Sequence, residues 1–274
     1  MSNPAPHASL SFDRAAEYYD ETRALPDAAQ RRVIELLVSE VRNREPCLEI
    51  GVGTGRIALP LFQAGIKMVG ADLSAPMLLK LEEKAGGAPF PLLRADATAL
   101  PFRDGIFSSA IACHVLHLIP EWRDAIGELA RTVRPGGTVL IEIGEWGHGE
   151  WERIVRRFCE EAAIPMRHRG VNEIREVDDA MAALGAATRP LPPVESHITK
   201  PFGELIDGLA NGTYSLTWQL GDDARKRAAG ATRVWAEASF GSLDRECKID
   251  SDITWRAYDL PDRGPTTGQE AAQS

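Results

Sequence analysis

Short apolar runs alternate with segments of helical spacing through the first half of the chain. The runs predict strands at 46–50, 67–72, 91–95, within 104–114 and at 138–143. Apolar positions spaced three and four apart predict helices at 12–23, 27–41, from 56 to about 64, after Ser74 and at about 122–132, the first with Ser11 as a plausible N-cap. Because parallel neighbours need a crossover, strands alternating with helices predict a doubly wound, mainly parallel α/β sheet.

The second half of the chain has a different pattern. Helical spacing predicts helices at 202–209, 213–220 and 222–240. A strictly alternating run from Lys248 to Tyr258 predicts one long final strand of the sheet, and Val194 to Thr199 are predicted to be its partner.

A glycine-rich turn separates the first predicted strand from the helix that follows it. Gly51, Gly53 and Gly55 are spaced G-x-G-x-G, and a strand that turns sharply into a helix leaves N–H groups available to a ligand. The dinucleotide fingerprint G-x-G-x-x-G does not fit, since Arg56 stands where its third glycine is needed. No Gly-Lys-Ser/Thr follows, which excludes a P-loop. A tight turn without a ligand is the alternative interpretation.

Composition and charge narrow the range of partners. The chain has 274 residues, 44% of them hydrophobic and 26% charged, as in ordinary globular proteins. No apolar run approaches the roughly twenty residues of a membrane span, and residues 1–9 lack a signal-peptide pattern. The four cysteines have no metal-binding spacing, so we expect reduced buried thiols, no metal and a cytoplasmic protein that binds no membrane.

Net charge argues against nucleic acid as a partner. A formal charge of −9 gives no general attraction to a polyanion. A local basic patch remains, with acidic residues interleaved, and we interpret it as a solvated helix face. It consists of Arg153, Arg156, Arg157, Arg167 and Arg169.

Five motifs in order carry a family resemblance. They are E-I-G-V-G-T-G from Glu49, G-A-D-L-S from Gly70, A-D-A-T-A-L-P-F from Ala95, D-G-I-F-S-S-A-I-A from Asp104 and R-P-G-G-T from Arg134. Residues 12–145 thereby resemble the class I S-adenosylmethionine-dependent methyltransferases, closest to the ubiquinone/menaquinone methyltransferase kind with a methyltransferase type 11 domain. The resemblance implies a Rossmann-like sheet of seven strands and S-adenosyl-L-methionine as cofactor.

The resemblance also implies a domain organisation. Residues 10–145 would form the cofactor-binding core, and 246–260 its last strand. Insertions after strand five usually form a lid over the substrate in this family, so 146–240 would be a helical lid that includes a sheet-completing segment at 189–200. The tails at 1–9 and 261–274 are expected to be disordered.

Cofactor-binding roles follow from the same resemblance. Glu49 would meet the ammonium group, Asp72 the ribose hydroxyls and Asp96 the adenine amino group. The other implied contacts are Tyr19, Arg23, Gly51, Gly53, Gly55, Leu73, Met77, Ala97 and Cys113. Structural alternatives exist, since Tyr19 could pack its helix on the core, Glu49 could bond the loop amides and Asp96 could form an Asx-turn.

The chemistry of methyl transfer asks the protein for alignment, exclusion of water and sometimes a base. His114 ends the central fourth strand and is the best-placed candidate base, although a packing role is open. Trp146, Tyr214 and Trp218 are candidates to line the substrate pocket. No D/N-P-P-Y/W sequence follows strand four, which argues against methylation of exocyclic base amines.

The function expected from the sequence is therefore methyl transfer from S-adenosylmethionine to a small organic molecule. An RNA-modifying methyltransferase and a catalytically silent cofactor-binding module are the alternatives. The acceptor, the atom methylated and the oligomeric state are not encoded in these patterns.

Overall fold

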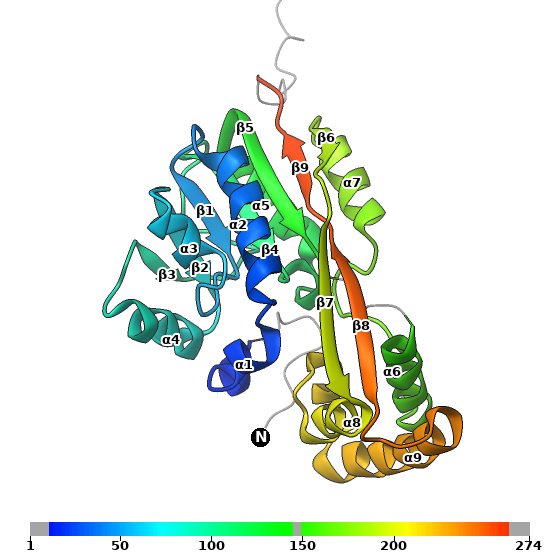
Figure 1. Cartoon of the computed structure of the whole chain (residues 1–274). Helices are drawn as coiled ribbons and strands as arrows, with labels where there is room; N and C mark the ends of the chain where they lie inside the picture. The colour runs from blue at the N-terminus through cyan, green and yellow to red at the C-terminus, as the bar shows by residue number, and fades with distance from the viewer. Residues whose placement is uncertain (1–10, 145–148, 263–274) are drawn as a thin grey trace, which may run out of the picture.

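The computed structural model describes residues 11–144 and 149–262, and a seven-stranded sheet forms its centre (Figure 1). The strands of this sheet, in spatial order, are β3 (Leu92–Arg94), β2 (Met68–Asp72), β1 (Cys47–Ile50), β4 (Phe107–Cys113), β5 (Val133–Glu142), β9 (Arg256–Asp259) and β6 (Ala187–Pro190). The α-helices are α1 (Tyr19–Arg23), α2 (Asp27–Val41), α3 (Ala58–Gln63), α4 (Ala75–Ala85), α5 (Trp122–Thr132), α6 (Glu150–Glu161), α7 (Ile174–Ala183), α8 (Phe202–Asn211) and α9 (Asp222–Phe240).

Strand direction confirms the predicted fold class. Neighbouring strands from β3 to β5 run parallel, and β9 runs antiparallel to both β5 and β6. The strand order reverses at β1, which has β2 on one side and β4 on the other. Ligands of open α/β sheets bind beyond the carboxyl ends of the strands at such a switch point.

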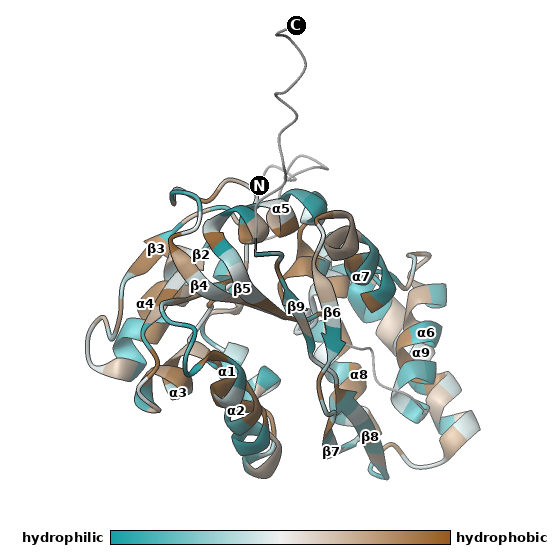
Figure 2. Cartoon of the chain, turned by 90° about the horizontal axis from the view of Figure 1, so that it is seen from above, coloured by the Kyte–Doolittle hydropathy of each residue, from teal (hydrophilic) through white to brown (hydrophobic). Residues whose placement is uncertain are grey.

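Helices cover both faces of the sheet because its central strands are apolar on both sides. Leu48 and Ile50 of β1 pack with Ile126 and Leu129 of α5. Cys47 of the same strand joins the cluster on the opposite face, which contains residues of α2, α3 and α4. Seen from above, α5 and α7 lie on one side of the sheet and α2 and α3 on the other (Figure 2).

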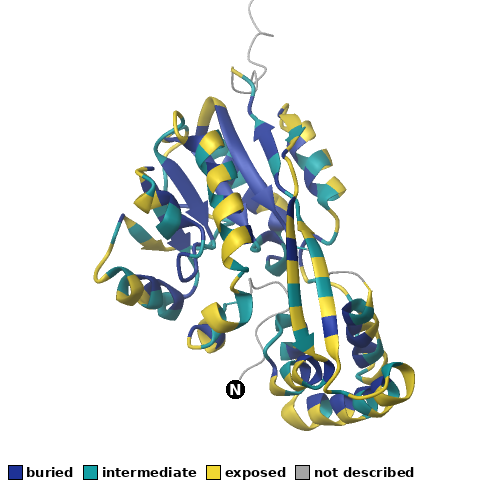
Figure 3. Cartoon of the chain, viewed as in Figure 1, coloured by how far each residue is buried: buried dark blue, intermediate teal, exposed yellow. Residues whose placement is uncertain are grey.

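A two-stranded ribbon, β7 (Val194–Pro201) with β8 (Glu246–Ile253), extends away from the main sheet. The prediction of one continuous final strand is therefore wrong, since β8 ends at Ile253 and only β9 lies in the main sheet. The predicted sheet-completing segment 189–200 also divides, because only its first two residues belong to β6. Figure 3 shows buried central strands and a ribbon of mixed exposure.

A third hydrophobic cluster lies at the far end of this ribbon. Phe158 of α6, Phe202 and Leu205 of α8 and Ala228 of α9 are buried together there. The predicted helix at 213–220 is instead a short 3-10 turn, η3 (Ser215–Gln219). Among the described residues, no helix is both long and apolar enough to cross a membrane.

The N-terminal segment differs from its prediction in form. The expected helix 12–23 is broken into a 3-10 turn, η1 (Asp13–Ala15), and α1, while Ser11 donates to the Asp13 carboxylate (2.6 Å) and not to a backbone group. Asp20 of α1 accepts hydrogen bonds from the Thr54 hydroxyl (2.6 Å) and from Lys84 of α4 (2.9 Å). These bonds attach the segment to the glycine loop. The predicted disordered tails, except residues 261 and 262, fall outside the described residues.

Candidate functional site

A cavity opens at the carboxyl ends of β1, β2 and β4, at the switch point of the sheet. Most of the predicted site residues line it: Tyr19, Gly51, Gly53, Asp72, Leu73, Met77, Asp96, Ala97, Cys113 and His114. Sequence reasoning missed several apolar residues of its wall, among them Phe12, Val115 and Leu118. Phe12 comes from the N-terminal segment, which therefore closes one side of the cavity.

The glycine loop leaves space where other residues would not. Gly51 has φ +64°, and a Cβ there would lie 2.5 Å from Cγ2 of Val115. Such a contact is impossible without movement of the loop after β4. Gly55 (φ +81°) has a different role, since it does not line the cavity and a Cβ there would lie 2.9 Å from Cγ of Leu81 on α4. The first glycine shapes the cavity and the third permits the packing of α4.

Asp72 ends β2 with both carboxylate oxygens held by backbone groups. Gly53 N–H donates to Oδ2 (2.8 Å) and Ser74 N–H donates to Oδ1 (2.8 Å). Burial raises the pKa of Asp72, and these two N–H groups oppose the rise. Each oxygen retains a second lone pair, so the carboxylate is fixed in place and can still accept from two neighbouring hydroxyls.

Asp96 follows β3 on the same edge. Its Oδ1 accepts from the backbone N–H (3.0 Å) and hydroxyl (2.8 Å) of Thr98, which is the Asx-turn alternative. That turn does not exclude a ligand, because Asp96 also lines the cavity together with Leu73 and Met77.

Glu49 is a buried carboxyl beneath the glycine loop. It is 2% exposed, and its Oε2 has no hydrogen-bond partner. Burial raises the pKa of Glu49 to about 8, although the Arg56 guanidinium opposes the rise. A buried acceptor without a donor is costly, so this atom points to a donor that a ligand would bring.

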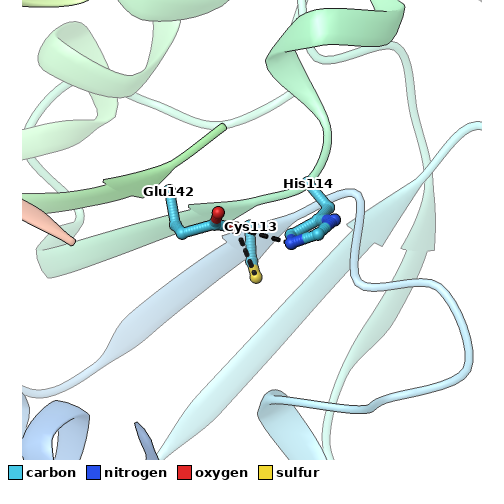
Figure 4. A group of neighbouring side chains, drawn as sticks. All are labelled: Cys113, His114 and Glu142. Carbon is cyan, nitrogen blue, oxygen red and sulfur yellow. Dashed lines mark hydrogen bonds and ion pairs between the residues drawn. The ribbon is translucent and has the colours of Figure 1, made fainter. Parts of the chain in front are cut away.

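His114 lies at the end of β4 in a hydrogen-bonded cluster with Cys113 and Glu142 (Figure 4). Its Nε2 lies 2.8 Å from Glu142 Oε2, and the backbone has φ +52°, which is rare outside glycine. Burial alone would raise the pKa of Glu142, but His114 and then Arg56 outweigh it and lower this pKa. Glu142 is therefore an ionised partner that orients the imidazole.

The same cluster contains residue types that bind metals, with ligand atoms within 4.8 Å of one another. The Arg56 guanidinium nitrogen lies 3.3 Å from Cys113 Sγ, and burial raises the pKa of that thiol. Gly144 N–H also occupies Glu142 Oε1 (2.6 Å). A neighbouring cation, a protonated thiol and carboxylate oxygens that already accept hydrogen bonds make this cluster better suited to a hydrogen-bonded network than to a metal site. Sequence reasoning singled out neither Glu142 nor a role for Arg56, although an acid inside an apolar strand was the available signal.

A second cavity, of about 210 Å³, adjoins the first through His114. It contains two predicted residues, Arg23 and Tyr214, with the Arg23 guanidinium 5.2 Å from the centre of the Tyr214 ring. Arg23 does not line the first cavity, where the sequence reading placed it. Trp151 of α6 forms another part of the wall, 5.3 Å from Tyr214 between ring centres.

A third cavity, of about 310 Å³, continues from the second and is lined in part by Trp218. Trp146 lies outside the described residues. Two other histidines lie apart from the first cavity: His117 lines the second and third cavities, whereas His197 is exposed on β7 beside Asp250. The predicted site residues thus divide between a cavity at the glycine loop and the space beyond His114.

Comparison with known proteins identifies the family. A family model described as a methyltransferase domain matches residues 48–141. A demethylmenaquinone methyltransferase of Streptomyces avermitilis is 35% identical over 53% of this chain and 63% of its own, and one of Mycolicibacterium gilvum is 32% identical over 69% and 81%. The crystal structure of the YcgJ protein of Bacillus subtilis superposes with a TM-score of 0.59 at 17% identity, covering 86% of this chain and 99% of its own, which shows the fold.

The matched part of the curated relatives differs in length. The chain spans 63% of the Streptomyces protein, 52% of a demethylmenaquinone methyltransferase of Thermus thermophilus and 48% of a phosphatidylethanolamine N-methyltransferase of Cereibacter sphaeroides. The Mycolicibacterium protein is matched over 81% of its length at 32% identity. Together with the sheet order and the glycine-loop cavity, this match means that the chain belongs to the class I S-adenosylmethionine-dependent methyltransferases.

Proposed function

We propose that this protein transfers a methyl group from S-adenosylmethionine to a small organic molecule. The observation that carries the proposal is the position of His114, which lines both the cavity at the glycine loop and the cavity beyond it. A cofactor in the first cavity and an acceptor in the second would meet at this residue.

The residues of the first cavity fit the cofactor. Asp72 presents two fixed carboxylate oxygens suited to a pair of ribose hydroxyls, and Asp96 with Leu73 and Met77 suits the adenine. Glu49 has a buried oxygen without a donor, which an ammonium group would supply. Because Gly51 has no Cβ, Val115 can pack against the loop, and the loop backbone at the cavity wall can approach the cofactor closely.

His114 would act as the base. The chemistry supplied by bound S-adenosylmethionine is a methyl group on a sulfonium, whose carbon–sulfur electron pair returns to sulfur as the acceptor's lone pair bonds the methyl carbon. If Nε2 of a neutral His114 donates to Glu142, the lone pair of Nδ1 would be the one that takes the acceptor's proton. The left-handed backbone of His114 is a strained conformation of the kind found at functional sites.

The helical region after β5 would be the substrate lid. Residues 149–240 include α6, α8, η3 and α9, and Trp151, Tyr214 and Ser215 from this region line the second cavity. A lid with aromatic side chains excludes water from a displacement reaction, which strengthens the electrostatic interactions within it.

Isothermal titration with S-adenosylhomocysteine tests the cofactor assignment. We expect binding to wild-type protein and a loss of about tenfold or more in Asp72→Ala, roughly one charge-assisted contact. Asp223→Ala, an exposed change at the start of α9, should leave affinity unchanged. Absence of binding to the folded wild type would overturn the proposal.

A methyl-transfer assay with radiolabelled S-adenosylmethionine separates the proposal from its alternatives. Wild type should label small acceptors, and His114→Asn should lower turnover while binding S-adenosylhomocysteine normally. Salt-dependent labelling of RNA would favour an RNA-modifying enzyme instead. Cofactor binding without labelling in either substrate class would favour a silent binding module.

A further inference from the structure

The two cavities beyond His114 adjoin each other. They share His117, His168, Ser215 and Leu216. The cavity lined by Arg23 and Tyr214 also shares His114 with the cavity at the glycine loop. The protein therefore offers a path from the site of methyl transfer outward between η3 and the segment around Arg167. Whatever occupies this path determines acceptor specificity.

The charge of this path is opposite to that of the chain. Asp and Glu outnumber Lys and Arg by 40 to 31 in the sequence. Yet no Asp or Glu occurs among the described residues that line the two cavities, whereas Arg23, Arg167 and Arg169 do. The lining that the structure describes thus has arginines and no carboxylates, which disfavours a cationic acceptor.

Arg23 is the cation nearest to the chemistry. It is half-buried, and its guanidinium donates only two long hydrogen bonds, to the carbonyl oxygens of Thr22 and Thr213 (both 3.3 Å). Within the described part of the chain no carboxylate forms an ion pair with it. Its cation–π contact with Tyr214 holds the guanidinium beside the ring while leaving N–H donors available.

The histidines of the path are polar groups that add no net charge. The rings of His117 and His168 lie 4.5 Å apart between centres, and those of His114 and His117 lie 6.2 Å apart. Burial lowers the pKa of His117 well below its ordinary value and lowers that of His168 to about 4. Both rings are therefore neutral near pH 7, and His117 Nδ1 is buried without a partner.

The shape of the second cavity limits the size of the acceptor. Its volume is about 210 Å³, with Trp151, Val155, Leu209 and Tyr214 as apolar walls. An engineered apolar cavity of about 150 Å³ holds benzene, so a substituted single ring fits here.

We propose that the methyl acceptor is an aromatic organic anion whose acidic group is bound by the Arg23 guanidinium while its nucleophilic atom lies beside His114. This assignment rests on the proposed methyl-transfer function and adds the chemical class of the substrate. A planar guanidinium recognises a carboxylate or a phosphate through paired N–H donors, and the aromatic walls accept the ring. Arg167 and Arg169, exposed farther along the path, attract the same sign of charge.

Matched probes test the sign of the charge. 4-Hydroxybenzoate and phenyl phosphate are anions, and 4-hydroxybenzamide is a neutral compound of nearly the same shape as the former. Each is titrated into full-length protein saturated with S-adenosylhomocysteine. We expect an anion to bind about tenfold or more tightly than the amide, the difference of one charge-assisted contact. Preference for benzoate over phenyl phosphate, or the reverse, identifies the acidic group.

Variants assign the preference to Arg23. Arg23→Met keeps an apolar chain against Tyr214 and should reduce the preference for the anion to less than about threefold, and Arg23→Lys should restore part of it. Arg103→Met removes an exposed arginine that lines none of the three cavities and should have no effect.

Three outcomes overturn the inference: failure of both anions to bind, equal affinity for acid and amide, or a preference that survives in Arg23→Met. Binding of S-adenosylhomocysteine itself is measured in the same titrations. Its absence would contradict the proposed function, whereas its presence without an anion preference would contradict only the acceptor class.

Discussion

Replacement of Glu49 by Gln tests the assignment of the cofactor cavity through the energetics of one buried carboxyl. Burial raises the pKa of Glu49 from its ordinary 4.5 to about 8. Between these values the folded protein holds a proton that the unfolded chain has released. The contribution of Glu49 to stability is therefore fully present below pH 4.5 and is lost as the pH rises to about 8.

The magnitude follows from the same shift. One pKa unit corresponds to about 1.4 kcal/mol, so this single group lowers the free energy of unfolding by about 2–3 kcal/mol between about pH 5 and about pH 7. Gln has nearly the shape of the protonated acid and does not titrate. We expect Glu49→Gln to match wild type within about 1 kcal/mol near pH 5 and to exceed it by about 3 kcal/mol near pH 7.

Urea unfolding of the ligand-free protein at the two pH values measures this difference. Glu35→Gln on α2, an exposed carboxyl, is the matched control and should change stability equally at both. An identical pH dependence in wild type and Glu49→Gln would refute the reasoning.

The cofactor should reverse the protonation state of Glu49. An ammonium group beside the carboxyl favours its ionised form, so binding of S-adenosylhomocysteine near pH 7 should release almost one proton from wild type and none from Glu49→Gln. Titration in two buffers of different ionisation enthalpy counts that proton. The variant should be more stable and yet bind about tenfold to a hundredfold more weakly, since it loses a charge-assisted contact of about 1.5–3 kcal/mol. Equal affinity would place the ammonium elsewhere.

Other changes test the remaining parts of the site. Gly51→Ala places a Cβ 2.5 Å from Val115 and should abolish the binding of S-adenosylhomocysteine measured by titration. A second change, Val115→Ala, should restore part of that binding. Undiminished binding to Gly51→Ala would contradict the close packing of Val115 on the glycine loop. Glu142→Gln removes about one charge-assisted hydrogen bond, so it should lower turnover tenfold or more and alter the pH dependence of turnover. Cofactor affinity should not change. An unchanged pH dependence would contradict the role of Glu142 in orienting His114. Asp20→Ala removes the hydrogen bond from Thr54, so it should weaken cofactor binding about threefold to tenfold and make the N-terminal segment more sensitive to limited proteolysis. Equal proteolysis of the variant and the wild type would contradict the anchoring role of this bond.

The elements that sequence patterns predicted best are those whose own residues determine them. The helices at 27–41 and about 122–132 appear with these bounds, because each has one apolar face that the sheet buries. The parallel strands are equally local, since burial on both faces requires continuous apolar runs. The cofactor cavity was predictable for the same reason, as its glycines and Asp72 occupy fixed places relative to strand ends.

The division of the final strand was not predictable in this way. Residues 248–258 alternate with a period of two throughout, and that period is the same in the main sheet and in the ribbon. Trp255, fully buried between β8 and β9, lies at the division, yet an aromatic residue in an alternating run favours continuation of a strand. Whether such a run forms one strand or two depends on the strands that pair with it. Here β9 pairs with β6 and β8 pairs with β7, and β6 and β7 also follow each other directly in the sequence.

The second cavity was hidden for a related reason. Its residues come from α1, the loops after β4 and β5, α6, the segment before α7, α8 and the region of η3, none of which carries a motif. Arg23 was noticed through the family resemblance and assigned to the cofactor, because the sequence does not show that η3 places Tyr214 beneath its guanidinium. His168 gave no signal, and Arg167 and Arg169 were grouped with helix residues. Arg156 and Arg157 of that group do pair with Glu152 and Glu161 on α6.

Two buried carboxyls, Glu49 beneath the glycine loop and Glu142 beside His114, explain how one site can bind a cation and also hold a base. Arg56 interacts electrostatically with both, yet the pKa of Glu49 is raised and that of Glu142 is lowered. The difference arises from partners, since Glu142 has His114 and the Gly144 N–H whereas Glu49 has an oxygen without a donor. Environments that move two pKa values apart assign different roles to chemically similar groups. Glu142 remains ionised and orients the imidazole, while Glu49 stays neutral until an ammonium group arrives. Charge in the cavity is thus balanced with and without the cofactor, which is why neither acid can be replaced by the other.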